Sequence, residues 1–249
     1  AGGDDIFSGY RRHWALMMEK YWSYFPNNIR RVMSAAAKRL PDSPTSIRRI
    51  AKAFQYADLD GDSRIASYFN WLGPDAVNSL LSDELRAELP FINPLEQSLA
   101  DIPENIPTLN RMLYLEQKHY LADHNLNYTD KMSMAEGIEV RVPLLDPDLV
   151  QLAALLPTQY KQNGREGKWI FKKAMEGILP NDIIYRPKTG FGAPIRNWIH
   201  GPLKTLVQDI LSESSINKRK WFDAKAVTQL LNQDRSGKID ASYSIFQLL

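Results

Sequence analysis

The chain opens on a glycine-acid segment whose residue types could bind a phosphorylated ligand. Gly2 and Gly3 are followed directly by Asp4 and Asp5. Adjacent glycines let a backbone approach phosphate oxygens closely, and carboxylates are the hard oxygen ligands that Mg²⁺ prefers. A plain Gly-Asp turn in front of a helix explains the same residues, so chemistry alone leaves both interpretations open.

A second segment presents opposite charges in an extended pattern. Glu139 and Arg141 alternate with the apolar residues Ile138, Val140 and Val142. In an extended run, both charged side chains would therefore leave the same face. Such a face can offer one negative and one positive group to a cleft, and a structural salt bridge is the competing explanation.

A third, late segment comprises residues 167–174 and 186–194 and places a lysine among conformationally constrained residues. Lys188 follows Pro187 and precedes a Gly190-Phe191-Gly192 turn, and Pro194 stiffens the far end. Prolines fix the backbone and glycines permit unusual dihedral angles, and irregular backbone of this kind often carries functional groups. We interpret Lys188 as a candidate functional cation, against the alternative of an ordinary exposed lysine.

Other motifs in the chain do not carry chemistry. The acidic run from Asp58 to Asp62 imitates a calcium loop, but Phe69 stands where such a loop needs its bidentate glutamate. His119 and His124 lack the spacing of a zinc-protease pair. The sequence contains no cysteine, which excludes disulfides, thiolate metal sites and a cysteine nucleophile. It also contains no serine-hydrolase elbow and no Gly-Lys-Ser/Thr phosphate loop.

Composition indicates an ordinary globular protein. Hydrophobic residues make up 44% of the 249 residues and charged residues 24%. A formal net charge of +2 gives no argument for a nucleic-acid or membrane partner. We find no apolar run of about 18 residues and no signal-peptide pattern. The sequence therefore predicts a cytoplasmic location.

The elements that must position these segments are predicted to be mostly helices. Apolar residues recur at helical spacing through most of the chain. Thr108 is predicted to cap an amphipathic helix with Met112, Leu115 and His119 on one face. The predicted helices cover residues 29–40, 46–56, 65–71, 83–89, 108–119, 148–156, 168–178, 203–211 and 224–232.

Strands and domain boundaries are less strongly indicated. The run 138–142 is the convincing extended segment, and short strands are expected at most there and near the start of the chain. Four prolines punctuate residues 90–107, which predicts a subdomain seam within one domain spanning residues 1–249.

Taken together and in order, the three segments resemble the asparagine synthase family. Its first signature, roughly Gly-x-Gly-Gly-Asp-Glu-Leu-Phe-x-Gly-Tyr, is similar to residues 2–10. Its middle signature, Asp-Arg-Met-Ser-Met-Ala-His-x-Leu-Glu-x-Arg-Val-Pro-Phe-Leu-Asp, is similar to residues 130–146. Its late signature, Gly-Lys-x-(Ile/Leu)-x-Lys-x-Ala followed by Arg-Pro-Lys-x-Gly-Phe-Gly-x-Pro, is similar to residues 167–174 and 186–194.

The resemblance implies a fold and a reaction. The fold would be mainly α, the helical C-terminal part of an α/β synthetase domain of the adenine-nucleotide α-hydrolase, or PP-loop ATP pyrophosphatase, type. The reaction would use ATP and Mg²⁺ to adenylate the side-chain carboxylate of aspartate. Ammonia derived from glutamine would then displace AMP and form asparagine. Nothing in the resemblance implies a nucleic-acid or membrane partner, and homo-oligomerisation through the parent protein stays open.

The resemblance also implies roles for matching residues. Gly2, Gly3, Asp4 and Asp5 would bind the nucleotide and pyrophosphate, with Asp4 as the Mg²⁺ ligand. Lys188 would stabilise charge on the α-phosphate and pyrophosphate.

In the middle segment, Glu139 would lie in the acceptor pocket as a base or a substrate-orienting group. Arg141 and Asp130 would hold that pocket as scaffold residues.

Several departures from the family pattern matter. Asp5 replaces a glutamate, Glu136 replaces a histidine, and Ala1 stands where several asparagine synthases have a glutamate. The family's Ser-Gly-Gly-x-Asp-Ser pyrophosphate loop and the catalytic cysteine of its glutaminase domain do not occur in the chain. We therefore expect the loop and the glutaminase domain to precede Ala1, and the isolated chain to be inactive.

Two other functions stay open. The chain could belong to a related synthetase that acts on another carboxylate, since pocket side chains choose the acceptor. It could also be a non-catalytic helical interaction module, although Asp4, Glu139 and Lys188 are all retained.

Overall fold

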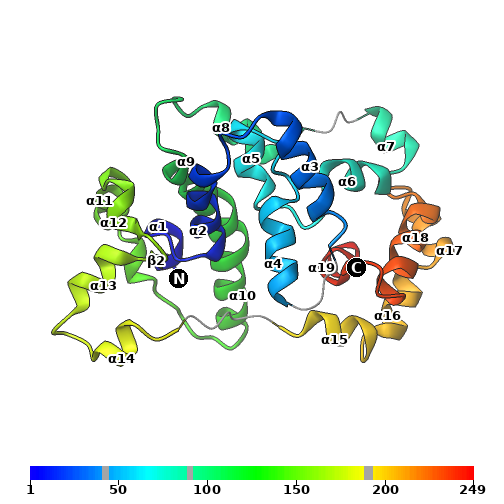
Figure 1. Cartoon of the computed structure of the whole chain (residues 1–249). Coiled ribbons are helices and arrows are strands. Elements are labelled where there is room, and N and C mark those ends of the chain that lie inside the picture. Colours follow the sequence, from blue (N-terminus) through cyan, green and yellow to red (C-terminus); the bar gives the residue numbers. More distant parts are fainter. Residues whose placement is uncertain (41–44, 89–91, 188–192) are drawn as a thin grey trace. The chain divides into compact units, whose positions relative to one another are not determined.

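The computed structural model describes residues 1–40, 45–88, 92–187 and 193–249. These residues are mainly helical, as predicted, and the sheet they form consists of two short antiparallel strands (Figure 1). The chain divides into two compact units, each built from three separate segments. Unit 1 comprises residues 1–32, 57–68 and 94–188, and unit 2 comprises residues 33–56, 69–93 and 189–249. None of the described helices is long and apolar enough to cross a membrane.

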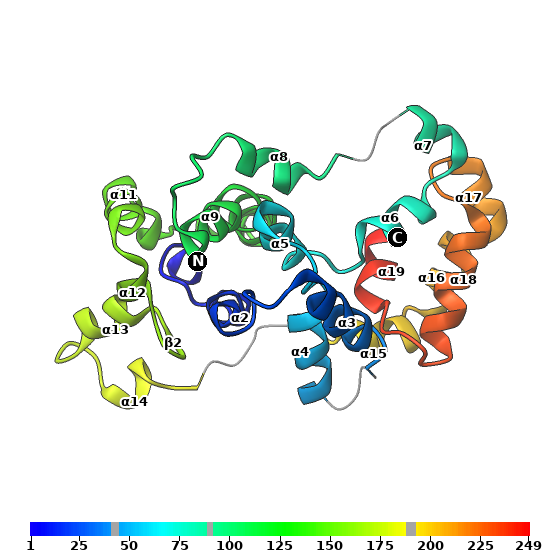
Figure 2. The same cartoon turned by 45° about the horizontal axis from the view of Figure 1, so that its top comes forward.

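Unit 1 contains all three segments singled out in the sequence, apart from the residues that follow Lys188. Helices α1 and α2 contact the helical run that begins with α9 (Figures 1 and 2). The elements of unit 1 are α1 (Gly3–Ile6), α2 (Arg11–Met18), the 3₁₀ helix η1 (Glu19–Tyr21), α5 (Gly61–Ser67), α8 (Pro94–Ala100), α9 (Thr108–Leu115), the π-helix η2 (Glu116–Leu126), α10 (Asn127–Ala135), the 3₁₀ helix η3 (Pro143–Leu145), α11 (Pro147–Leu155), α12 (Thr158–Lys161), β1 (Gln162–Asn163), β2 (Glu166–Gly167), α13 (Trp169–Met175) and α14 (Asn181–Ile184).

Helix α9 supplies much of the apolar interior of unit 1. Met112 and Leu115 are fully buried, as the predicted amphipathic pattern requires. The helix begins at Thr108 with Pro107 as its N-cap residue, so the predicted cap is one residue late. A second apolar cluster joins Ile6 and Phe7 to Ala153 of α11, and it anchors the glycine-acid segment.

Two predictions for strands are wrong. Residues 138–142 form no strand, and the start of the chain is the short helix α1. The strands β1 and β2 instead pair Gln162 with Gly167. Residues 138–142 have no neighbouring strand among the described residues, so their alternating pattern is not stabilised by ladder hydrogen bonds.

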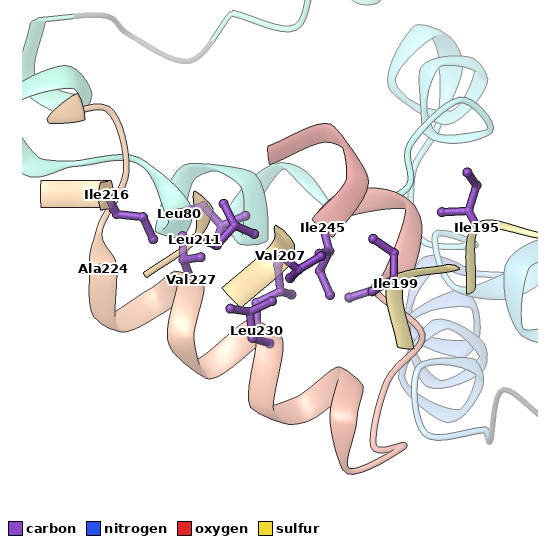
Figure 3. Close-up of a cluster of buried hydrophobic side chains, with 12 residues drawn as sticks. Leu80, Ile195, Ile199, Val207, Leu211, Ile216, Ala224, Val227, Leu230 and Ile245 are labelled. Carbon is purple, nitrogen blue, oxygen red and sulfur yellow. The ribbon is translucent and has the colours of Figure 1, made fainter. Parts of the chain in front are cut away.

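Unit 2 is an assembly of helices around one apolar cluster. Side chains from α16, α18 and α19, among others, meet in its interior (Figure 3). Its elements are α4 (Thr45–Phe54), α6 (Pro74–Leu80), α7 (Asp83–Glu88), α15 (Ile195–His200), α16 (Lys204–Ile210), α17 (Glu213–Arg219), α18 (Ala224–Arg235) and α19 (Ser242–Leu248). Helix α3 (Asn27–Ala37) carries a boundary between the units at Val32 and Met33.

Local sequence signals set several helix ends in both units. Asp223 caps α18 by accepting a hydrogen bond from the N–H of Ala226 at 2.6 Å. Asp146 caps α11 in the same way, and Pro147 follows at the position where proline is best tolerated. In unit 2, an isolated antiparallel β-bridge also pairs Leu81 with Phe222, whose side chain packs against the apolar cluster.

Candidate functional site

The glycine-acid segment, residues 2–10, and the middle segment, residues 130–146, pack against each other at glycines. Gly2 has a φ angle of +94°, and a Cβ atom there would lie 2.5 Å from a methyl carbon of Leu145. A Cβ atom on Gly3 would lie 3.1 Å from a methyl carbon of Leu144. Gly2 therefore needs both its backbone conformation and its missing side chain to let the acidic turn lie on the Leu144–Leu145 pair.

The first and late segments also meet at a glycine. A Cβ atom on Gly167 would lie 2.0 Å from the carbonyl oxygen of Ser8. The N–H of Lys168 donates a hydrogen bond of 2.9 Å to the carbonyl of Phe7, and the rings of Phe7 and Phe171 stack with centroids 5.5 Å apart. This backbone contact brings Lys168 directly beside the acidic turn.

Asp4 and Lys168 form the charged pair at this junction. Their Oδ1 and Nζ atoms are 2.9 Å apart, and the side chains are 26% and 31% exposed. Lys168 adopts a left-handed conformation with φ of +57° at the start of α13. Gly9 makes room for the carboxylate, because a Cβ atom there would lie 1.7 Å from Oδ1 of Asp4. A carboxylate and an ammonium are thus held together and partly open to solvent.

Asp5 faces the interior. It is 1% exposed and accepts a hydrogen bond of 3.2 Å from the hydroxyl of Tyr10. Burial, reinforced by the negative charges of Glu116 and Asp4, raises the pKa of Asp5 to about 6, against the opposing effect of the Tyr10 hydrogen bond. Consecutive helical residues project about 100° apart, which explains why neighbouring aspartates have such different surroundings.

A buried polar network lies behind Asp5. Glu116 is fully buried and accepts hydrogen bonds from Nε and Nη2 of Arg12, each at 2.5 Å. Nε2 of His13 lies 2.7 Å from the same carboxylate. Burial opposes ionisation of Glu116, but these donors outweigh it and hold the pKa of Glu116 below its ordinary value. Burial also lowers the pKa of His13, so the neutral imidazole is favoured as the donor to Glu116.

The predicted acceptor residues lie on an exposed segment. Nη2 of Arg141 is 2.5 Å from Oε1 of Glu139, and their side chains are 83% and 67% exposed. The two charges therefore share a face, as the alternating pattern predicts, although the segment is not a strand. Asp130 is exposed on α10. Both the pocket role of Glu139 and the scaffold roles of Arg141 and Asp130 stay predictions.

Lys188 lies outside the described residues, together with the turn that follows it. Its predicted role at the phosphates is therefore carried by the sequence alone.

The side chains at the junction could bind one divalent cation, provided that a substrate supplied the remaining ligands. Among the described residues, no group of three or more histidine or carboxylate side chains could hold a metal ion. Mg²⁺ in phosphoryl-transfer sites is commonly held by one or two carboxylates plus substrate phosphate oxygens. The partly exposed carboxylate of Asp4 fits that pattern, whereas Asp5 is turned away from solvent.

Lys168 stands in the late signature, but the sequence assigns it no role. Its signal was present, since a lysine directly after Gly167 sits on a constrained turn. Its proximity to Asp4 was not readable, because a long-range contact between residues 4 and 168 depends on how the backbone at Ser8 and Gly167 packs.

Comparison with known proteins identifies the family. The family model described as asparagine synthase matches residues 1–249. The chain belongs to the asparagine synthase family. It is 25% identical, over its whole length, to asparagine synthetase [glutamine-hydrolyzing] 1 of Bacillus subtilis, of which the match covers 38%. It is 29% identical to asparagine synthetase [glutamine-hydrolyzing] 3 of the same organism, over 69% of this chain and 30% of that protein.

A plant member gives a shorter match. Asparagine synthetase [glutamine-hydrolyzing] of Zea mays is 31% identical over 37% of this chain and 17% of its own length. The chain thus spans well under half the length of these curated relatives. No solved structure matches it.

Proposed function

We propose that the chain forms part of an ATP-dependent amidotransferase that converts the side-chain carboxylate of aspartate into an amide. A carboxylate oxygen attacks the α-phosphorus of ATP, and pyrophosphate leaves. Ammonia, derived from glutamine, then attacks the acyl carbon, and AMP leaves as asparagine forms. Family membership supports this reaction, and the observation that carries it in this chain is the Asp4–Lys168 pair at the junction of the three segments.

The junction is suited to bind the polyphosphate of ATP. Leu145 and Leu144 occupy the space where Gly2 and Gly3 lack side chains, so these glycines would contact the nucleotide through their backbone groups at the start of α1. Asp4 would hold Mg²⁺ together with phosphate oxygens, and Mg²⁺ would supply charge neutralisation there. The ammonium of Lys168, now paired with Asp4, is placed to donate to a phosphate oxygen when Asp4 takes up the cation.

Lys188 is proposed as the second cation for the phosphates. An ammonium about 4 Å from a unit negative charge contributes roughly 4 kcal/mol at an effective dielectric of about 20. If this stabilisation applies only in the transition state, it corresponds to a rate increase of about a thousandfold. Lys188 would therefore act on both steps, as negative charge develops on pyrophosphate and then on AMP.

Glu139 is proposed to orient the acceptor or to act as a base toward ammonia. Its exposed carboxylate pairs with Arg141 at 2.5 Å and keeps acceptor capacity for a substrate ammonium. Asp5 is proposed to act at the nucleotide side of the site only through its neighbours, since its own carboxylate is buried.

The test is a stoichiometric assay of the full-length protein that contains this chain. Supplied with Mg·ATP, ammonia and aspartate, it should form AMP, pyrophosphate and asparagine in equal amounts. Lys188→Ala should lower turnover by about a thousandfold, whereas Lys204→Ala, at an exposed lysine of unit 2, should not. The isolated 249-residue chain, which lacks the family's pyrophosphate loop, should give no turnover.

Two other outcomes of the assay would favour the alternative functions. Turnover with another carboxylic acid but not with aspartate would keep the chemistry and replace the substrate. An absence of AMP formation with every carboxylic acid tried would contradict the proposal and favour a non-catalytic module.

A further inference from the structure

The hydroxyl of Tyr10 joins the acidic turn to the π-helix η2. It donates to Oδ1 of Asp5 at 3.2 Å and accepts from Nδ2 of Asn125, also at 3.2 Å. Asn125 lies near the end of η2 and Asp5 lies in α1. One side-chain oxygen therefore connects two elements more than a hundred residues apart in the sequence.

The ring of Tyr10 is itself held on three sides. The guanidinium carbon of Arg12 lies 4.6 Å from its centroid. The rings of His13 and Tyr120 meet it edge-to-face, with centroids at 5.4 and 5.6 Å. Arg12 and His13 are in turn fixed by the buried carboxylate of Glu116. The hydroxyl therefore sits at a defined point, as a positioned group must.

Helix α1 depends on outside contacts for its orientation. It is four residues long, and no side chain caps its N-terminus. Isolated helices of that length are not stable in water. Because Asp4 and Asp5 are consecutive in it, an anchor on the Asp5 side chain restricts the rotation that would swing the Asp4 carboxylate away from the junction.

We infer that Tyr10 is a positioning residue for the polyphosphate site. Through Asp5 and Asn125, its hydroxyl holds α1 so that Asp4 points toward the phosphates and their cation. This inference rests on the proposed function, because it assigns Asp4 to that ligand. The competing explanation is that Tyr10 contributes only packing, which would require its ring and not its hydroxyl.

The test separates the hydroxyl from the ring. Tyr10→Phe keeps the aromatic contacts and removes the oxygen. In the full-length protein, the dissociation constant of Mn²⁺·ATP, measured by the electron paramagnetic resonance signal of free Mn²⁺, should rise about three- to tenfold. The KM for Mg·ATP should rise in parallel, while the KM for aspartate stays within twofold of wild type.

Two further variants complete the design. Asn125→Ala removes the donor to the same hydroxyl and should weaken Mn²⁺·ATP binding in the same direction. Combined with Tyr10→Phe, it should add little, because both changes break one connection. Tyr114→Phe is the matched control, since the half-buried Tyr114 of α9 has no hydroxyl hydrogen bond among the described residues.

The outcomes distinguish this inference from the proposed function. Mn²⁺·ATP affinity and Mg·ATP KM within twofold of wild type in Tyr10→Phe would overturn the positioning role. Equal increases in the KM values of Mg·ATP and aspartate would also overturn it, as a general loosening of the fold would. Failure of the wild-type protein to form AMP would instead count against the reaction, and the binding measurement would still report on Tyr10.

Discussion

The two units of the chain differ in what fills their interiors. Unit 2 buries one large apolar cluster. Among the described residues of unit 2, the charged side chain that is buried is that of Asp234. Unit 1 buries many more ionisable side chains, which are those of Asp5, His13, Arg30, Arg64, Arg111, Glu116 and Lys161.

Buried charges cost free energy unless they are paired and hydrogen-bonded. The interior of unit 1 therefore depends on specific networks in addition to the apolar packing around α9, whereas that of unit 2 depends mainly on non-directional apolar packing. The candidate site lies in the unit that buries more ionisable side chains. We interpret unit 2 as the apolar, stabilising body and unit 1 as the part whose interior is arranged to hold polar groups in place.

A substitution that creates a cavity in the apolar cluster of unit 2 should cause the largest change in stability. Ile216 is fully buried in the apolar cluster, so Ile216→Ala should lower the free energy of unfolding of unit 2 by about 2 to 5 kcal/mol. Leu206→Ala, at a leucine that is 46% exposed on α16, is the control and should change it by less than about 1 kcal/mol. Urea unfolding measures both. Equal effects of the two changes would break the comparison.

Adding a side chain at the close contact between Gly167 and Ser8 in unit 1 should cause the next largest loss of stability. Gly167→Ala would place a Cβ atom 2.0 Å from the backbone of Ser8, and we expect a loss of about 3 kcal/mol. Gly164→Ala is the matched control in the same hairpin. Unlike Gly167, Gly164 has a positive φ, +57°, and it has open space around it, so its loss should be about 1 kcal/mol from backbone strain alone. If Gly167→Ala were no worse than Gly164→Ala in urea unfolding, the contact between the first and late segments would be wrong.

Lys161 should make unit 1 sensitive to alkaline pH. Its ammonium is buried with Asn110 as hydrogen-bond partner at 2.9 Å, and burial lowers the pKa of Lys161 to about 8 from an ordinary 10.5. The unfolded chain therefore binds the proton more tightly, and stability rises as pH increases from about 8 to 10.5. The full change is at most about 3 kcal/mol.

Lys161→Met removes both the cost and its pH dependence. We expect the free energy of unfolding at pH 7 to increase by about 1 to 2 kcal/mol, after allowance for the lost hydrogen bond to Asn110. The rise between pH 8 and 10.5 should disappear. Lys218→Met, at an exposed lysine of unit 2, should keep the wild-type pH profile. An unchanged profile in Lys161→Met would show that Lys161 is not the group responsible.

Substitutions at the turn around Ser8 should have the smallest effects on stability. Ser8 has a φ angle of +66° and donates from its hydroxyl to Gln162 at 2.9 Å. Ser8→Gly relieves a left-handed conformation but loses the hydrogen bond, so the two effects, each about 1 kcal/mol, should nearly cancel. Ser8→Ala keeps the strain and loses the hydrogen bond, and should cost about 1 to 2 kcal/mol. A thermal unfolding series ranks the three proteins.

Local patterns in the sequence predicted the helices well. The ranges predicted near 108–119, 148–156 and 224–232 correspond to α9, α11 and α18, because apolar periodicity and capping residues are local signals. The strand predicted at 138–142 was wrong, since alternation cannot show whether a partner strand exists. The strands β1 and β2 are only two residues each and leave too short a pattern to read.

The site was predicted in part. The glycine-acid turn and the shared face of Glu139 and Arg141 follow from residue types and spacing. The inward direction of Asp5 and the pairing of Asp4 with Lys168 depend on contacts with η2 and α13, which no local pattern encodes. Roles for Lys188, which lies outside the described residues, remain predictions.

The most direct test of the account is a double-mutant cycle on Asp4 and Lys168, with AMP formation by the full-length protein as the readout. We predict that Asp4→Asn and Lys168→Met each lower kcat/KM for Mg·ATP by on the order of a hundredfold, or about 3 kcal/mol. The double variant should lose much less than the product of the two, because both side chains serve one polyphosphate. Single variants that keep kcat/KM within twofold of wild type would show that the junction of the three segments is not the ATP site.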